Sequence, residues 1–195
     1  MSSPFKTTQS LLAALGLGAL LACGGGSSST TPAPTKTLAD TLTYAAPISG
    51  TYTLVKNATK STAGHLVLDL VGPAGSVSGV GFYLTADQTK VTWAPVDAGD
   101  AEKVKSAAFA STIVTSKVSG DTLQAAIYQK GTTAAVIATS STVLASVALD
   151  LKSGIPVSSN VTLAAPGGKA VILNAPASSQ PTTAIVISVG ALTAN

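Results

Sequence analysis

The chain has 195 residues, the length of one domain with an appendage, and its net charge of +3 comes from lysine alone because the sequence contains no arginine. One histidine, one cysteine and eight acidic residues are too few for most metal centres and nucleophilic active sites. A small excess of lysine without arginine is also a poor basis for binding nucleic acid. We therefore expect no enzyme activity, no cofactor and no nucleic-acid partner. With 23 serines and 26 threonines, the composition favours many short β-strands over helices.

The first 22 residues have the pattern of a signal peptide. A short polar start contains Lys6, and an apolar run, LLAALGLGALLA, covers residues 11–22. That run is too short to span a bilayer, which needs about 20 apolar residues. It ends at small residues, as a cleaved secretory signal does, so residues 1–22 are predicted to be removed.

The end of this run, Leu20-Leu21-Ala22-Cys23, resembles the lipobox of bacterial lipoproteins. The resemblance implies that the Cys23 thiol carries a lipid and that the chain is anchored to a membrane of the cell envelope. Because Gly24 rather than aspartate follows the cysteine, it also implies the outer membrane. Residues 23–37 contain GGGSSSTTPAPT, which is predicted to be a disordered tether, and residues 38–195 are predicted to be the folded domain.

Alternating apolar residues between turn signals predict strands throughout the folded domain. The expected strands are Thr51–Lys56, His65–Val71, Val77–Thr85, Lys90–Val96, Ala108–Val118, Thr122–Lys130, Thr142–Lys152, and short runs at Val161–Leu163, Ala170–Leu173 and Thr183–Val189. One helical turn is possible within residues 101–110. In this register Leu68, Phe82, Ile127 and Val147 point inward, and the pattern predicts an antiparallel β-sandwich.

Four segments carry a resemblance to a known family. They are LVLDLVGPAG with its Gly-Pro turn, VSGVGFYLTAD, SGDTLQAAIYQKG and LASVALDLK, with a tryptophan-bearing strand between the second and the third. Their order is similar to that of cohesin domains and of the carbohydrate-binding modules that share the cohesin sandwich. The resemblance implies a nine-stranded sandwich of jelly-roll type. It also implies a binding role, since cohesins hold dockerin domains and their relatives hold polysaccharide.

The same resemblance places the strands of Tyr83 and Tyr128 side by side in one sheet. Alternation then puts Tyr83, Gln124 and Tyr128 on one outward face, which is the candidate binding face for a protein or glycan. Trp93 is added to this site as a ring that could stack on a sugar, although the alternative that it belongs to the core stays open.

Two further groups have both a functional and a structural interpretation. Asp97, Asp100 and Glu102 form the one acidic cluster of the sequence and are a candidate calcium site, with a solvated loop as the alternative. His65, the one histidine, begins an expected strand and is interpreted as an edge or solvent-facing residue.

The main functional hypothesis is a lipid-anchored, cohesin-like binding module of the cell envelope. The alternative is an accessory lipoprotein of a surface or secretion apparatus that docks by strand addition and has no carbohydrate role.

Overall fold

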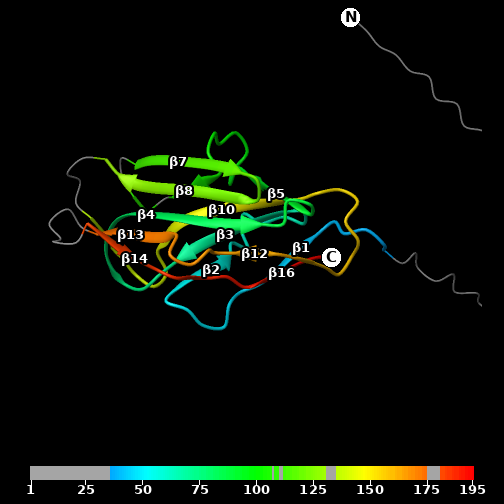
Figure 1. Cartoon of the computed structure of the whole chain (residues 1–195), viewed down its shortest axis with the longest axis horizontal. Helices are drawn as coiled ribbons and strands as arrows, with labels where there is room; N and C mark the ends of the chain where they lie inside the picture. Colours follow the sequence, from blue (N-terminus) through cyan, green and yellow to red (C-terminus); the bar gives the residue numbers. More distant parts are fainter. Residues whose placement is uncertain (1–35, 107, 110–111, 131–134, 175–180) are drawn as a thin grey trace, which may run out of the picture. The chain divides into compact units, whose positions relative to one another are not determined.

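The computed structural model describes residues 36–106, 108–109, 112–130, 135–174 and 181–195. All regular elements in these residues are β-strands, and Lys36–Asn195 forms one compact unit (Figure 1). The predicted signal peptide, the predicted lipid site at Cys23 and the tether up to residue 35 lie outside the described residues.

One large sheet, here called the front sheet, has the strand order β14-β13-β4-β8-β7, and β12 and β9 also pair with β4. All its pairings are antiparallel. Its strands are β4 (Gly75–Ala86), β7 (Thr112–Ser119), β8 (Thr122–Gln129), β9 (Val136–Ala138), β12 (Leu163–Ala164), β13 (Ala170–Asn174) and β14 (Thr182–Ala184).

The second large sheet, here called the back sheet, has the order β15-β2-β3-β10-β5, with β6 also paired to β10. The β15–β2 pair is parallel and the other pairs are antiparallel. Its strands are β2 (Tyr52–Lys56), β3 (His65–Val71), β5 (Val91–Ala94), β6 (Val104–Lys105), β10 (Val143–Leu151) and β15 (Ile187–Ser188).

A small third sheet, here called the end sheet, joins the two ends of the compact unit. It contains β1 (Leu42–Ala45), β16 (Ala191–Ala194) and β11 (Ser159–Val161), in the order β1-β16-β11. The backbone of Thr41 exchanges two hydrogen bonds with that of Asn195, at 2.8 and 2.9 Å. Neither β1 nor β16 was among the predicted strands.

The inward side chains of both large sheets form one core, as alternation predicts for a sandwich. The four residues predicted to be buried are at most 1% exposed: Leu68, Phe82, Ile127 and Val147. The prediction of an antiparallel β-sandwich is thus confirmed.

Several local predictions are wrong. The expected runs Val161–Leu163 and Thr183–Val189 are each divided between two sheets, the first between β11 and β12 and the second between β14 and β15. Alternation along β10 breaks at its start, where the pairing with β3 shifts between Val143 and Ala145 and Leu144 is buried beside Ala145. Burial also continues on the other side of the strand, where Ala148 packs with Val67, Ala94 and Val96. The helical turn proposed for residues 101–110 is absent from their described part, where Val104–Lys105 forms β6 because it pairs with β10.

Tyr44 connects the end sheet to the core. Its hydroxyl donates a hydrogen bond to the Leu54 carbonyl, at 3.1 Å, and accepts one from the Gly190 N–H, at 2.7 Å. Burial raises the pKa of this hydroxyl. Both polar contacts are needed, because a buried hydroxyl without partners would destabilise the fold.

Candidate binding face

The register of the front sheet arranges its outward residues in three rows that cross four neighbouring strands. The rows follow directly from the pairing of β7 with β8, β8 with β4 and β4 with β13. The first row is Lys117, Gln124, Tyr83 and Lys169; the second is Thr115, Ala126, Gly81 and Val171; the third is Ile113, Tyr128, Gly79 and Leu173. Lys169 completes the first row because its carbonyl accepts the N–H of Tyr83, at 3.1 Å.

The rows differ in chemistry. The first carries two lysines at its ends, the second has short side chains, and the third is largely apolar. A shallow hollow of about 360 Å³ lies where the first and second rows meet, lined by Tyr83, Thr115, Lys117, Gln124, Ala125 and Ala126. Tyr83, Gln124 and Tyr128 all lie on this outward face and are half-buried, and their role in binding stays a prediction.

Tyr128 is held against the sheet by the residue opposite it. A methyl group added to Gly79 would lie 2.7 Å from Cβ of Tyr128 and 2.6 Å from the carbonyl oxygen of Ile127. Glycine at this position therefore allows β4 and β8 to approach each other beneath the tyrosine. Gly81, two residues along, has more space, since its nearest contact would be Val171 at 3.6 Å.

The Tyr83 ring also has a neighbour. The Lys169 ammonium lies 6.0 Å from the ring centroid, near the limit for a cation–π contact. This places the lysine beside the tyrosine, at the edge of the face.

Trp93 is not part of this face, so that prediction is wrong and the core alternative holds. Its side chain is 4% exposed, and its indole N–H donates to the Asp121 carbonyl, at 3.1 Å. Trp93 lies on β5 of the back sheet and Asp121 lies in the turn between β7 and β8 of the front sheet. The tryptophan therefore connects the two sheets through the core.

The acidic cluster contacts lysines and serine. Asp97 accepts from Lys60 at 2.8 Å and from Lys105 at 2.7 Å, and Asp100 also accepts from Lys105. Glu102 accepts both the N–H and the hydroxyl of Ser116, each at 2.6 Å. In the part of the chain that the structure describes, no group of three or more acidic, histidine or cysteine side chains is arranged to hold a metal ion. The calcium hypothesis thus has no support in the geometry.

This arrangement predicts a pH dependence of stability. Hydrogen bonds from Lys105 and then Lys60 lower the pKa of Asp97 from 3.8 to about 2. A carboxyl group whose pKa is lower in the folded state than in the unfolded state stabilises the fold at pH values above its unfolded-state pKa. This stabilisation is lost as the pH falls through the folded-state pKa. Wild type should melt at a higher temperature than Asp97→Asn at neutral pH. The gap should close between about pH 4 and about pH 2, and a gap constant across this range would contradict the assignment.

His65 faces Asp150 across β3 and β10 on the outer side of the back sheet. Its Nδ1 lies 2.5 Å from Oδ1 of Asp150, and the side chain is 27% exposed. The pair lines a hollow of about 470 Å³ together with Lys60, Asp97 and Pro95. His65 is thus not at the edge of the sheet, because β10 pairs alongside β3, but it lies on the outer, solvent-facing side, which was the other half of the interpretation.

Lys117 and Lys169 were not among the predicted site residues. If the pairing of β7 with β8 had been known, alternation counted from the inward Val114 would have placed Lys117 on the outward side. Lys169 gives no such signal, since it follows the Gly167-Gly168 turn and joins the row only through pairing with β4.

Among the residues that the structure describes, no helix is long and apolar enough to cross a membrane. No protein-family model matches the sequence, and no curated protein matches it. The comparisons with solved structures do find matches, and the three described next are low in sequence identity.

A chain from the crystal structure of a complex between CaCohA2 and a CaDoc0917 variant is 14% identical, with a TM-score of 0.51, and covers 74% of this chain and 100% of its own. The sixth cohesin of scaffoldin B from Acetivibrio cellulolyticus, crystallised with a mutant Cel5 dockerin, is 18% identical, with a TM-score of 0.49, and covers 73% of this chain and 97% of its own. The type II cohesin A11 from Bacteroides cellulosolvens is 9% identical, with a TM-score of 0.46, and covers 74% and 98%. Lys36–Asn195 has a cohesin-like β-sandwich fold.

Proposed function

We propose that this chain is a non-catalytic, cohesin-like binding module whose front-sheet face holds a protein partner. The observation that carries the proposal is the set of three rows, which puts short, apolar and cationic side chains on one regular surface. The solved chain with a TM-score of 0.51 comes from a complex of two proteins. We propose that this chain likewise binds a partner protein.

The chemistry of the face favours a protein over a polysaccharide. Sugar-binding surfaces use exposed aromatic faces, but Trp93 is buried and the two tyrosines of this face, Tyr83 and Tyr128, are half-buried. The aliphatic Val171 and Leu173 and the small Gly81 and Ala126 instead suit the close, flat contact found at the centre of protein interfaces.

The alternative of docking by strand addition is opposed by the edge of β7. The N–H of Ser116 on that edge is already bonded to the Glu102 carboxylate, and the Ser116 hydroxyl binds the same carboxylate oxygen. A charged side chain on an edge hinders pairing with a further strand.

Gly81→Trp tests the proposed face. An added Cβ meets only ordinary contacts, so the variant should fold, while the indole would stand in the middle of the second row. The matched control is Thr92→Trp, at an exposed position of β5 on the opposite side of the sandwich. Wild type and both variants are each cross-linked to proteins in an extract of the source cells. A protein that binds the front-sheet face should be captured by wild type and by Thr92→Trp but not by Gly81→Trp. If both variants capture the same bands as wild type, the proposal is wrong.

We also propose that the module is anchored to the cell envelope, on the outer membrane, through a lipid on Cys23. The support is the resemblance of Leu20–Cys23 to the lipobox and the Gly/Ser/Thr/Pro tether behind it. Cys23→Ala should move the protein from the membrane fraction to the soluble fraction, because the lipid supplies the membrane affinity. Cys23→Ala that fractionates like wild type would contradict the anchor.

A further inference from the structure

Beyond the question of which face binds, the structure carries information about the charge of the partner. All eight carboxylates of the chain lie among the described residues, and none occupies a position in the three rows. The ionisable groups of the first row are two lysines, Lys117 and Lys169. The face is therefore cationic beyond what the chain's small net charge implies.

These two lysines differ from four of the lysines elsewhere on the domain. Lys36, Lys60, Lys90 and Lys105 each form an ion pair with an aspartate. Among the described residues no carboxylate lies within ion-pair distance of Lys117 or Lys169, and both side chains are exposed. Their charges are thus uncompensated within the fold and are available to a partner.

The row also fixes where those charges lie. Lys117 on β7 and Lys169 beside β4 are separated by three strand spacings, about 14 Å at about 4.8 Å per strand. Gln124 and Tyr83 lie between them, and the small second row lies next to them. A partner that contacts Gly81 and Ala126 would therefore place its own edge over the two ammonium groups.

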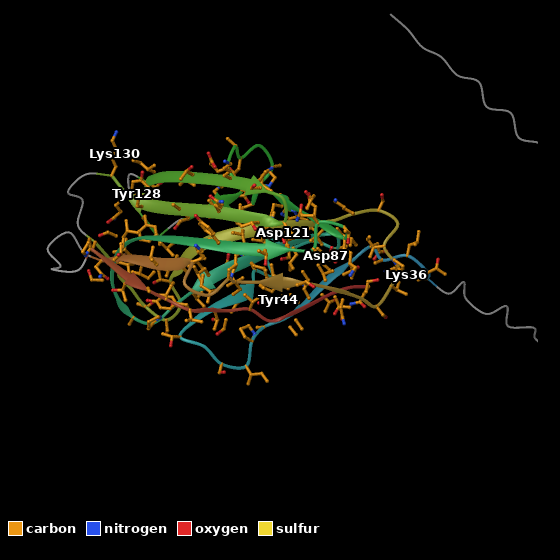
Figure 2. The ribbon with its side chains drawn as sticks, in the orientation of Figure 1. Lys36, Tyr44, Asp87, Asp121, Tyr128 and Lys130 are labelled. Atoms are coloured by element: carbon orange, nitrogen blue, oxygen red, sulfur yellow. The ribbon has the colours of Figure 1, made fainter. Side chains whose placement is uncertain are left out.

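The nearest carboxylates along these strands belong to Asp87 and Asp121, at the ends of β4 and β7. Figure 2 shows both at one end of the front sheet, opposite the end that holds Tyr128 and Lys130. Asp87 is engaged by Thr89 and Lys90, and Asp121 accepts from Thr122. Both carboxylates contact residues close to them in the chain, so neither neutralises the lysine charges of the first row.

We propose that the front sheet selects an acidic protein surface, one that seats an apolar patch on the second and third rows and carboxylates on Lys117 and Lys169. This inference rests on the proposed function and adds the partner's chemistry to it. Charges at the border of an interface mainly raise the association rate and exclude partners of like charge, so these lysines would act on selectivity and speed more than on the apolar contact.

The test uses a displayed library of random peptides as the probe, selected on the wild-type protein. Peptides are assigned to the front-sheet face if they no longer bind the Gly81→Trp variant but still bind the Thr92→Trp variant. We expect this set to be enriched in aspartate and glutamate beside apolar residues. Selection on Lys117→Glu/Lys169→Glu should instead enrich lysine and arginine in the same set.

The kinetics of one selected acidic peptide give the second measurement. At low ionic strength the double charge reversal should slow its association by about ten- to a hundredfold, and added salt should remove most of the difference. The control is Lys56→Glu/Lys152→Glu, which makes the same change in net charge on two exposed lysines of the back sheet, one at the end of β2 and one directly after β10. That control should leave the association rate close to that of wild type.

The outcomes separate this inference from the proposed function. If face-binding peptides show no excess of acidic residues, the selectivity proposal is wrong while the binding face stands. If no selected peptide is lost with Gly81→Trp, the proposed face itself fails. If polygalacturonate binds the same face and displaces the peptides at lower concentration, the partner is an anionic polysaccharide and the protein assignment is overturned.

Discussion

Phe82→Ala should lower the free energy of unfolding by about 3–5 kcal/mol, because the phenyl ring is removed from a fully enclosed site. Phe82 is 1% exposed and lies on β4 between two partners of the front sheet, Ala125 on β8 and Ala170 on β13. These neighbours are alanines, so no large side chain beside it in the sheet can fill the space. Chemical denaturation of the two proteins at the same pH measures the difference directly.

The neighbouring residue provides the control for that experiment. Tyr83 is next in the chain but points outward, so Tyr83→Ala should cost about 1 kcal/mol or less. If the two variants gave equal losses, or the order were reversed, the register of β4 would be one residue off, since a slip of one residue exchanges the two faces of a strand.

Gly190→Ala should be the most disruptive glycine substitution in the described part of the chain. A methyl group on Gly190 would lie 1.8 Å from the carbonyl oxygen of Ala45 and 2.9 Å from its carbonyl carbon. Both are backbone atoms of β1, so the clash cannot be relieved by a side-chain rotation. The end sheet must open, and the bond from the Gly190 N–H to the Tyr44 hydroxyl is broken with it. We expect a loss of about 3 kcal/mol or more, as for the larger strain and network effects.

Gly75→Ala is the matched substitution, because an added methyl group there meets nothing within 4 Å. It should change stability little or raise it slightly, since alanine restricts the unfolded chain more than glycine does. Thermal unfolding of both variants is sufficient to compare them. A Gly190→Ala protein that melts with wild type would show that β1 does not pack against residue 190.

The strands that could be predicted are those in which alternation is strong and the turns are marked. β3, β4 and β8 contain apolar residues at every second position between Gly, Pro, Ser or Asp turns, and their inward faces were predicted correctly. β1 and β16 were missed because LTYA and ALTA are too short for alternation to be distinguished from chance. They become strands only by pairing with each other, a contact between opposite ends of the domain.

The candidate site was predictable in part for the same reason. Tyr83, Gln124 and Tyr128 follow from alternation within single strands together with the neighbouring placement of β4 and β8. Trp93 was misplaced because a period of two shows which residues share a side but not which side meets the core. Lys169 could not be found at all, since its position depends on pairing across more than 80 residues of sequence.

The hydrogen bonds between Thr41 and Asn195 determine how the domain would respond to being pulled. A force applied at Lys36 first meets the backbone hydrogen bonds that residues 37–41 form with Ile155, Val157 and Asn195. It then reaches β1, whose first residue, Leu42, is paired with Ala194 near the other end of the unit. Antiparallel strands loaded in this way separate one residue pair after another, so little force is needed to begin peeling. Peeling would meet its main resistance at Tyr44, where the hydroxyl binds both Leu54 and Gly190 and the ring is packed in the core. Leu42 is buried in the same core, so β1 would resist peeling through two side chains that must both leave it.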